Sequence, residues 1–226
     1  MIEKGIKMGR DKFFTFLRTN SMLVLKLKNY HITTNSSHQF HKYKNLVKDK
    51  VPKRPEQLWV TDITYIKTDQ GHNYLALFTD AYSKQIMGYC LANHMKASLC
   101  MEALNMAIKN KRYPNKKLIH HSDRGFQYCC MQYTSFTQSN HIIMSMTEQY
   151  DPYENAVAER INRTLKYEYG LKQTIKNTQT AQQIVKEAVL IYNNLRPHLS
   201  LNLRKPTEVH LNPNLKYKSY KRENLN

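Results

Sequence analysis

The chain has 226 residues, 41% of them hydrophobic, which is enough to build a core of ordinary domain size and argues against intrinsic disorder. Its formal net charge is +18, and no run of apolar residues approaches the roughly 20 that a membrane-spanning helix needs. The four cysteines show no zinc-ligand spacing, so we interpret them as reduced thiols of a cytoplasmic protein.

The positive charge is concentrated at the two ends of the chain. Counting Lys and Arg against Asp and Glu, residues 1–55 carry +10, residues 56–159 carry −1 and residues 160–226 carry +9. Basic flanks can neutralise the phosphates of a polyanion, while the acidic side chains of a near-neutral centre remain available as metal ligands. We therefore expect a nucleic acid as the partner; basic tails that only aid solubility are the simpler alternative.

The first quarter of the chain predicts a helix followed by an arm. Residues 8–18 have helical spacing, with Phe13 and Leu17 on the apolar side. Residues 29–55 are polar and contain two prolines, a composition typical of a linker. We expect residues 1–55 to form a basic helical arm that supplies part of a DNA-binding region.

The remainder predicts alternating strands and helices. The first three strands, separated by short turns, predict an antiparallel meander, and the whole order predicts an α/β domain with a mixed sheet. We expect a core over residues 56–172, followed by a C-terminal helix and basic tail over residues 173–226. The expected elements are strands at 58–66, 73–78 and 85–91, a helix at 97–110, and strands at 118–121 and 141–146 joined through a helix. Two further helices are expected, one that begins near residues 152–155 and one that spans residues 180–193.

Three acidic residues lie in contexts that fit one metal-dependent site. Asp62 lies within the first predicted strand, Asp123 directly follows a later one, and Glu159 lies in a predicted helix after a gap of 35 residues. Burying a carboxylate in an otherwise apolar strand is costly unless its charge is compensated. A divalent cation is the usual compensation, so the sequence predicts a phosphoryl-transfer site.

The chemistry of such a site follows from charge. Three neighbouring carboxylates repel one another, and two Mg²⁺ ions about 3.5–4 Å apart would remove that repulsion, activate a water or 3′-hydroxyl and stabilise the leaving oxygen. Mn²⁺ is the alternative metal. Arg163 and Lys166, on the same polar stripe of the helix as Glu159, would hold substrate phosphates. The simpler alternative for this stripe is a Glu159–Arg163 pair worth ~0.3–0.5 kcal/mol.

Four segments of the chain resemble, in order, the OrfB transposases of bacterial insertion sequences, whose catalytic domain is similar to retroviral integrases. The resemblance covers roughly residues 8–212, and the combination of segments is highly specific. The matching segments are residues 58–66 (LWVTDITYI), 121–128 (HSDRGFQY), 145–147 (SMT) with 154–160 (ENAVAER), and 192–198 (YNNLRPH).

The resemblance implies a ribonuclease-H-like fold with a five-stranded mixed sheet flanked by helices, and a DDE site formed by Asp62, Asp123 and Glu159. It also implies Mg²⁺-dependent strand cleavage and strand transfer at element ends and at target DNA, by a homo-multimer associated with the bacterial nucleoid. Arg124 and Asn155 lie in matching segments, and we expect both to contact DNA; a helix N-cap is the alternative role for Asn155.

Two rival functions remain open. The chain begins late relative to the family, so we expect a separate upstream-frame product, OrfA, to supply recognition of the element ends. That late start, together with Tyr150 where many relatives have Gly, motivates the first rival: a truncated, non-catalytic DNA-binding remnant. The second rival is a ribonuclease-H-type nuclease acting on RNA–DNA hybrids.

Overall fold

The structure, a computed structural model, describes residues 9–23, 39–48, 50–148, 155–212 and 214. Contacts divide the chain into two compact units, residues 1–31 and residues 32–226. In the first unit α1 (Arg10–Thr19) confirms the helix predicted near the start of the chain, and none of its residues is buried. The predicted division of the chain at residues 55 and 172 stays a prediction.

Three sequence predictions fall outside the described residues: the arm between residues 29 and 38, the loop around Tyr150 and the basic tail at residues 216–226. Within the part that the structure describes, no helix is both long and apolar enough to cross a membrane. All four cysteines are described, and all four are free thiols.

Five strands of the second unit form one mixed sheet in the order β3-β2-β1-β4-β5. The pairs β1–β2 and β2–β3 are antiparallel, whereas β1–β4 and β4–β5 are parallel. The predicted meander and the predicted mixed five-stranded sheet are therefore confirmed. The strands are β1 (Leu58–Thr68), β2 (Gly71–Asp80), β3 (Ile86–Ala92), β4 (Leu118–Ser122) and β5 (Ile142–Met146).

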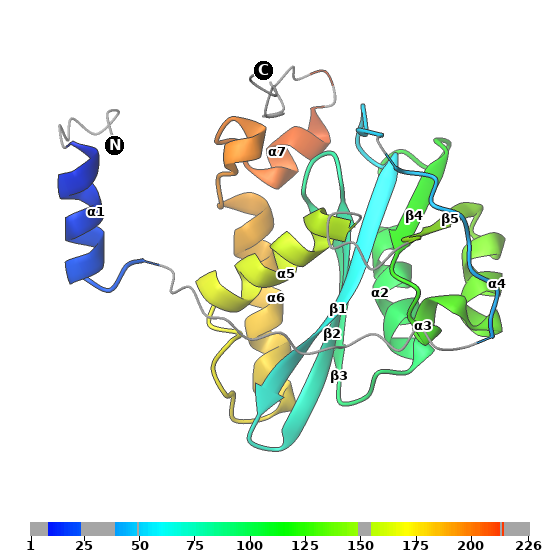
Figure 1. Ribbon diagram of the computed structural model, residues 1–226, viewed down its shortest axis with the longest axis horizontal. Helices are drawn as coiled ribbons and strands as arrows, with labels where there is room; N and C mark the ends of the chain where they lie inside the picture. The colour runs from blue at the N-terminus through cyan, green and yellow to red at the C-terminus, as the bar shows by residue number, and fades with distance from the viewer. Residues whose placement is uncertain (1–8, 24–38, 49, 149–154, 213, 215–226) are drawn as a thin grey trace. The chain divides into compact units, whose positions relative to one another are not determined.

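Helices cover both faces of this sheet (Figure 1). The helices that lie between β3 and β5 in the chain pack on one face, and α5 and α6 pack on the other. Between β4 and β5 the sequence predicted one helix, but the extended backbone of Cys130 divides this segment into two, α3 and α4. The helices are α2 (Ala97–Lys109), α3 (Phe126–Cys129) and α4 (Met131–Ser139) on the first face, then α5 (Ala156–Glu168), α6 (Thr178–Asn194), the 3-10 turn η3 (Leu199–Leu201) and α7 (Pro206–Leu211).

The side chains of β1 alternate between the two helical layers. Trp59 and Ile63 belong to the hydrophobic cluster that contains α2. Val60 and Ile66 belong to clusters that contain residues of α5. Because successive side chains of a strand point to opposite faces, Asp62 lies on the face of Val60 and Ile66, the face that α5 covers.

The C-terminal matching segment, residues 192–198, attaches α6 to the rest of the fold. The Asn193 side chain donates to the carbonyl of Ile86 at 2.9 Å and accepts from its N–H at 2.9 Å, so it binds the first residue of the edge strand β3. The Arg196 guanidinium donates two hydrogen bonds to the Glu168 carboxylate, at 2.6 and 2.7 Å. These contacts give the segment a structural role that the sequence resemblance did not specify.

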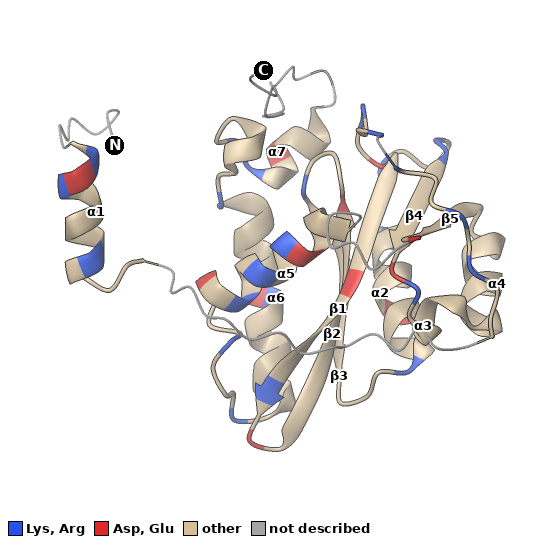
Figure 2. Cartoon of the chain, in the orientation of Figure 1, with Lys and Arg blue, Asp and Glu red and all other residues tan. Residues whose placement is uncertain are grey.

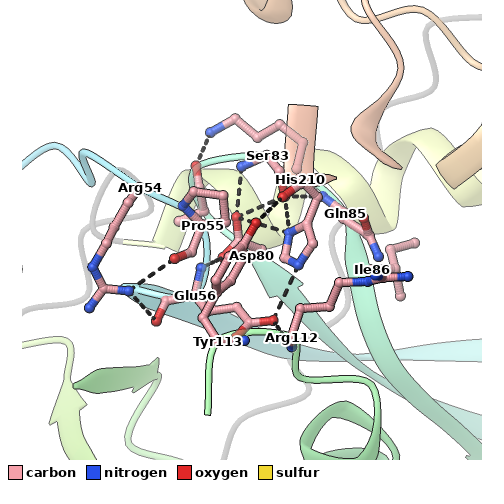
Figure 3. A network of polar contacts seen from close by, with 12 residues as sticks. Arg54, Pro55, Glu56, Asp80, Ser83, Gln85, Ile86, Arg112, Tyr113 and His210 are labelled. Carbon is pink, nitrogen blue, oxygen red and sulfur yellow. Dashed lines mark hydrogen bonds and ion pairs between the residues drawn. The ribbon is translucent and has the colours of Figure 1, made fainter. Parts of the chain in front are cut away.

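A buried polar network anchors α7 to the sheet (Figure 3). The His210 ring lies 2.9 Å from the Ser83 hydroxyl and 3.2 Å from a Glu56 carboxylate oxygen. Asp80 accepts from the backbone N–H of Glu56 at 2.6 Å and from the Ser83 N–H at 2.7 Å. All four side chains are buried, so α7 joins the segment just before β1 to the end of β2 and the turn that follows it.

The two carboxylates of this network are compensated differently. Burial by itself raises the pKa of Glu56, but hydrogen bonds from His210, Arg112 and Tyr113 hold that pKa below its ordinary value. Burial raises the pKa of Asp80, and the nearby His210 and the bonds from Ser83 only partly oppose the rise. The His210 hydrogen bond is the largest of the effects that keep Glu56 ionised. Loss of the His210 side chain would therefore leave the buried Glu56 carboxylate poorly compensated.

We expect His210→Ala to lower the free energy of unfolding by roughly 2–4 kcal/mol, because it leaves buried polar groups without a partner. Urea denaturation measures the loss. The matched control is His72→Ala, an exposed histidine on β2, for which we expect a change within about 0.5 kcal/mol. Equal effects of the two substitutions would show that the network does not hold α7 in place.

Candidate active site

The parallel pairing of β1 with β4 brings two of the predicted acidic residues together. The recorded ladder ends with Val60 opposite His121, and continuing it by two residues places Asp62 level with Asp123. Paired residues of parallel strands share a face of the sheet, and neighbouring strands lie about 4.8 Å apart. The pairing thus brings the segment after β4 close to the middle of β1, and a common face for Asp62 and Asp123 stays a prediction.

Helix α5 crosses this face and is held to β1 by two asparagines. The Asn155 side chain donates to the carbonyl oxygen of Thr61 at 2.8 Å, and the Asn162 side chain donates to the Asp62 carboxylate at 2.8 Å. Glu159 lies between these asparagines, four residues after the first and three before the second, on one stripe of the helix. The stripe that carries Glu159 therefore faces the Thr61–Asp62 segment.

Two acidic neighbours act on the Asp62 carboxyl. Burial raises the pKa of Asp62 to about 7, and the negative charges of Asp123 and Glu159 contribute to the rise. Hydrogen bonds from Asn162 and from the N–H of Ile63 oppose it. Glu159 is exposed as a whole residue, although partial burial of its carboxyl raises its pKa as well. The negative charges of Asp123 and Glu159 thus act on Asp62, while mutual repulsion among all three carboxylates stays a prediction.

The carboxylate and amide oxygens are suitable ligands for a divalent cation, but the carboxylates that the structure describes are not grouped closely. Carboxylates that raise one another's proton affinity are the oxygen ligands that Mg²⁺ prefers. Beside them, the side-chain oxygens of Asn155 and Asn162 are buried and accept no hydrogen bond from any residue that the structure describes. Among the described residues, no three His, Cys, Asp or Glu side chains are already grouped closely enough to hold a metal ion. Asp62, Asp123 and Glu159 as the metal-binding set therefore stay a prediction.

The Asp123 carboxylate is held by a hydrogen bond from the backbone two residues later. The backbone N–H of Gly125 donates to the Asp123 carboxylate at 3.0 Å. A Cβ atom at Gly125 would lie 3.0 Å from that same oxygen and 2.9 Å from the Gln127 side chain. A side chain here would press on the ends of the Asp123 and Gln127 side chains and would shift the Asp123 carboxylate by a few tenths of an ångström.

Cations flank the carboxylates along α5, where Figure 2 shows basic and acidic positions side by side. The Lys166 ammonium lies 4.0 Å from the centroid of the Tyr65 ring on β1. Burial lowers the pKa of Lys166 to about 8, and the nearby Asp62 opposes this fall. Arg163 is exposed and lies over the Tyr167 ring, and it forms no ion pair with Glu159, so the simpler alternative for this stripe is not realised.

Two of the residues predicted to contact DNA, Arg124 and Asn155, are less exposed than Arg163. Arg124 is half-buried beside Asp123. Asn155 precedes α5 as its N-cap residue, but its side chain makes no capping bond and instead binds β1. Contact of either residue with DNA stays a prediction. Sequence reasoning missed Asn162 as a site residue, although its spacing of three from Glu159 on the same stripe was a usable signal.

Models of one protein family match the chain. Residues 52–152 match the family described as integrase core domain, and residues 140–206 match a second model with the same description.

Curated relatives come from bacterial insertion elements. The chain is 34% identical over 203 residues to the insertion element IS600 uncharacterized 31 kDa protein of Shigella sonnei, a match that covers 89% of this chain and 74% of the relative. It is 34% identical to the transposase for IS629 of Shigella sonnei and 32% identical to the transposase for IS904 of Lactococcus lactis. These matches cover 65% and 68% of this chain but 49% and 61% of the two transposases.

Solved structures with a similar fold come from retroviruses. At 19% identity, the simian T-cell lymphotropic virus intasome, in complex with PP2A regulatory subunit B56 gamma, gives a TM-score of 0.62 over 81% of this chain and 63% of that chain. The HTLV-2 integrase catalytic core domain in complex with magnesium, also at 19% identity, gives 0.54 over 70% and 97%. These likenesses confirm the predicted ribonuclease-H-like fold.

The integrase-core matches and the insertion-sequence relatives define a polynucleotidyl transferase of the DDE class. The chain belongs to the integrase-core family of insertion-sequence transposases.

The raised pKa of Asp62 predicts a pH-dependent penalty on folding. Below the ordinary pKa of 3.8 the carboxyl is neutral in both states, and the stability it permits is lost as the pH rises through the folded-state pKa of about 7. Asp62→Asn removes this charge at every pH. Without divalent cations, we expect its stability advantage over the unmodified chain to grow by about 2–3 kcal/mol between pH 5 and pH 8, most of it below pH 7. Thermal denaturation across this range measures it, and a constant difference would contradict the assignment.

We expect Gly125→Ala to reduce DNA cleavage much more than it reduces stability, because the added Cβ displaces the Asp123 carboxylate. A misplacement of about 1 Å at a reacting centre can cost roughly a hundredfold in rate. The control is Gly9→Ala, since a Cβ at Gly9 meets no atom within 4 Å. Cleavage rates and melting temperatures of both variants, measured together, separate displacement of the carboxylate from a general loss of stability.

Proposed function

We propose that this chain cleaves DNA strands at the ends of an insertion sequence and transfers the resulting 3′-hydroxyls to target DNA. The observation that carries the proposal is Asp62: its charge is raised in energy by burial, Asp123 and Glu159, while Asn162 holds its carboxylate in place. Such a carboxylate is a structural cost for the folded protein unless a cation compensates it. The family to which the chain belongs supports the same activity.

We propose that Asp62, Asp123 and Glu159 bind two Mg²⁺ ions, with Mn²⁺ as the alternative. When bound, these ions supply a lowered pKa for the attacking hydroxyl and stabilisation of the leaving oxygen. The magnesium present in the HTLV-2 integrase core structure supports the choice of metal. The two unpartnered asparagine oxygens, of Asn155 and Asn162, support an environment that orients water or ligand at this place.

The chain's own residues hold the substrate and orient the carboxylates. Asn162 fixes the Asp62 carboxylate by a hydrogen bond, so the oxygen that faces the substrate keeps one orientation. The cations Arg163 and Lys166 bind phosphates of the DNA backbone on the α5 side, and Arg124 does so beside Asp123. We assign Asn155 a DNA contact through its position at the start of α5.

We propose that the active form is a homo-multimer in the cytoplasm of a bacterium, associated with the nucleoid. The retroviral neighbours include an intasome and a dimeric form of the integrase core domain, which supports a multimer. Recognition of the element ends would involve an upstream-frame product, OrfA. The chain spans about half to three-quarters of the length of its curated relatives, so the activity of a whole transposase is also part of this proposal.

A non-catalytic DNA-binding remnant is the second candidate. The open arrangement of the carboxylates favours it, because the described His, Cys, Asp and Glu side chains form no group of three that is ready for metal. The remnant would bind DNA with the same basic flanks but would not cut it. A nuclease for RNA–DNA hybrids is separable by offering hybrid and duplex substrates side by side.

We expect Asp62→Asn and Glu159→Gln each to lower Mg²⁺-dependent DNA cleavage by at least a thousandfold while changing duplex binding less than threefold, since both remove a metal ligand and no phosphate contact. Gel-based cleavage and fluorescence anisotropy measure the two properties. The matched control is Asp69→Asn, an exposed aspartate at the β1–β2 turn, which should cleave at the unmodified rate. Full cleavage by the double variant would refute the site, and an unmodified chain that binds but never cleaves would favour the remnant.

A further inference from the structure

Residues 39–48, named here the strap, lie along the sheet beside β4 and β5 (Figure 1). The backbone N–H of Leu46 donates to the Ser145 hydroxyl on β5 at 2.9 Å, and the N–H of Asn45 donates to the Glu148 carboxylate at 3.1 Å. Val47 packs against the cluster that contains Val60 of β1. The strap is therefore docked on the core by specific contacts.

The side chains of the strap divide into an inner and an outer set. The inner set is half-buried and consists of Tyr43, Asn45, Leu46 and Val47. The outer set is exposed and includes the lysines Lys42, Lys44 and Lys48. Docking by the inner set thus holds three ammonium groups toward solvent on a fixed backbone, which reduces the entropy lost when they bind a ligand.

The strap runs along β5, next to the strand β4 that precedes Asp123, and its Val47 packs in the cluster that also contains Ala158 of α5. Ser145, which binds the strap, also lies 2.8 Å from the His121 ring, and His121 is two residues before Asp123. The Phe40 ring contacts the Phe126 ring, three residues after Asp123, with 5.4 Å between centroids. Since α5 lies over β1 and the strap lies along β4–β5, the two flank the end of β4 where Asp123 is placed.

Charge effects agree with this position. Burial raises the pKa of the Cys129 thiol to about 11, and Asp123 adds to the rise. The positive charges of Lys42 and Arg124 oppose it. The charges of Lys42, Asp123 and Arg124 therefore all affect the Cys129 thiol, which indicates that Lys42 lies on the same side of the domain as the other two.

We infer that the strap is a DNA-backbone contact: Lys42, Lys44 and Lys48 bind phosphates of the strand that crosses the carboxylates, opposite the cations of α5. The inference rests on the proposed function, because it takes DNA as the substrate. It adds a second, separate phosphate-binding surface, and it narrows the DNA-binding role expected for residues 1–55 to three lysines on one docked segment. Ser145 is a positioning residue in this arrangement, since it binds the strap on one side and His121 on the other.

The test is the salt dependence of DNA binding by the full chain. Each lost phosphate contact lowers the slope of log K against log salt by about 0.9 on duplex DNA. For Lys42→Gln, Lys44→Gln and Lys48→Gln combined, we expect the slope to fall by about 2–3 and affinity near 150 mM salt to fall roughly tenfold to a hundredfold. Fluorescence anisotropy with a duplex of about 30 base pairs, a length of roughly three helical turns, measures both.

The matched control removes the same three charges elsewhere, by Lys109→Gln, Lys116→Gln and Lys117→Gln. These lysines are exposed and lie at the end of α2 and before β4, at the opposite end of that strand from Asp123. We expect their slope to stay within about half a unit of the unmodified value. A strap variant with an unchanged slope, or a control variant with an equal loss, overturns the inference.

Failure of the strap and failure of the proposed function give different results. If the unmodified chain cleaves DNA but the strap slope is unchanged, the function stands and the strap inference fails. If the slope falls but the chain never cleaves with Mg²⁺ or Mn²⁺, the strap binds DNA and the proposed catalysis fails.

Docking of the strap is tested by Ser145→Ala, with Ser139→Ala as an exposed serine control. We expect trypsin to cleave after Lys42, Lys44 and Lys48 at least fivefold faster in Ser145→Ala, and duplex DNA to protect these sites in the unmodified chain. Mass spectrometry of the fragments locates each cleavage. Faster cleavage spread evenly over the chain would mean a general loss of stability and would overturn the docking role of Ser145.

Discussion

A carboxylate on the central strand is the constraint on which the rest of the structure depends. Asp62 lies on β1 between two helical layers, where burial and two neighbouring acids raise its pKa to about 7. A fold selected for stability alone would place an apolar residue there, as it does at Val60 and Ile66 on the same face. Hydrogen bonds from Asn162 of α5 and from the N–H of Ile63 oppose this cost, whereas the negative charges of Asp123 and Glu159 add to it.

Asparagines, rather than charges, hold α5 in position. Asn155 binds a backbone carbonyl of β1 and Asn162 binds Asp62, so the helix is fixed at two points with Glu159 between them. Neutral donors can do this without cancelling the negative charge that a metal ion would need. Lys166 remains above Tyr65, one turn farther along, where its charge opposes that of Asp62 without forming an ion pair.

Segments from both ends of the chain complete this domain. His210 of α7 closes a buried network with Glu56 at the start of β1, and Asn193 of α6 binds the first residue of β3. The strap reaches Ser145 on β5 from the N-terminal side. The basic flanks identified from charge are thus partly built into the fold, and the docked portions carry cations to fixed places near the carboxylates.

The sequence by itself determined the order of the elements, because alternating and helical apolar spacing record which side chains are buried. It also indicated Asp62, Asp123 and Glu159 and the family, because these residue types recur at fixed places in four ordered segments. It did not determine the docking of the strap or the roles of Asn162 and His210. Those depend on partners about 100 residues or more away, and only parallel pairing of β1 with β4 and the packing of α5 and α7 bring them together. Local spacing carries no record of such contacts, so the tertiary structure alone decided them.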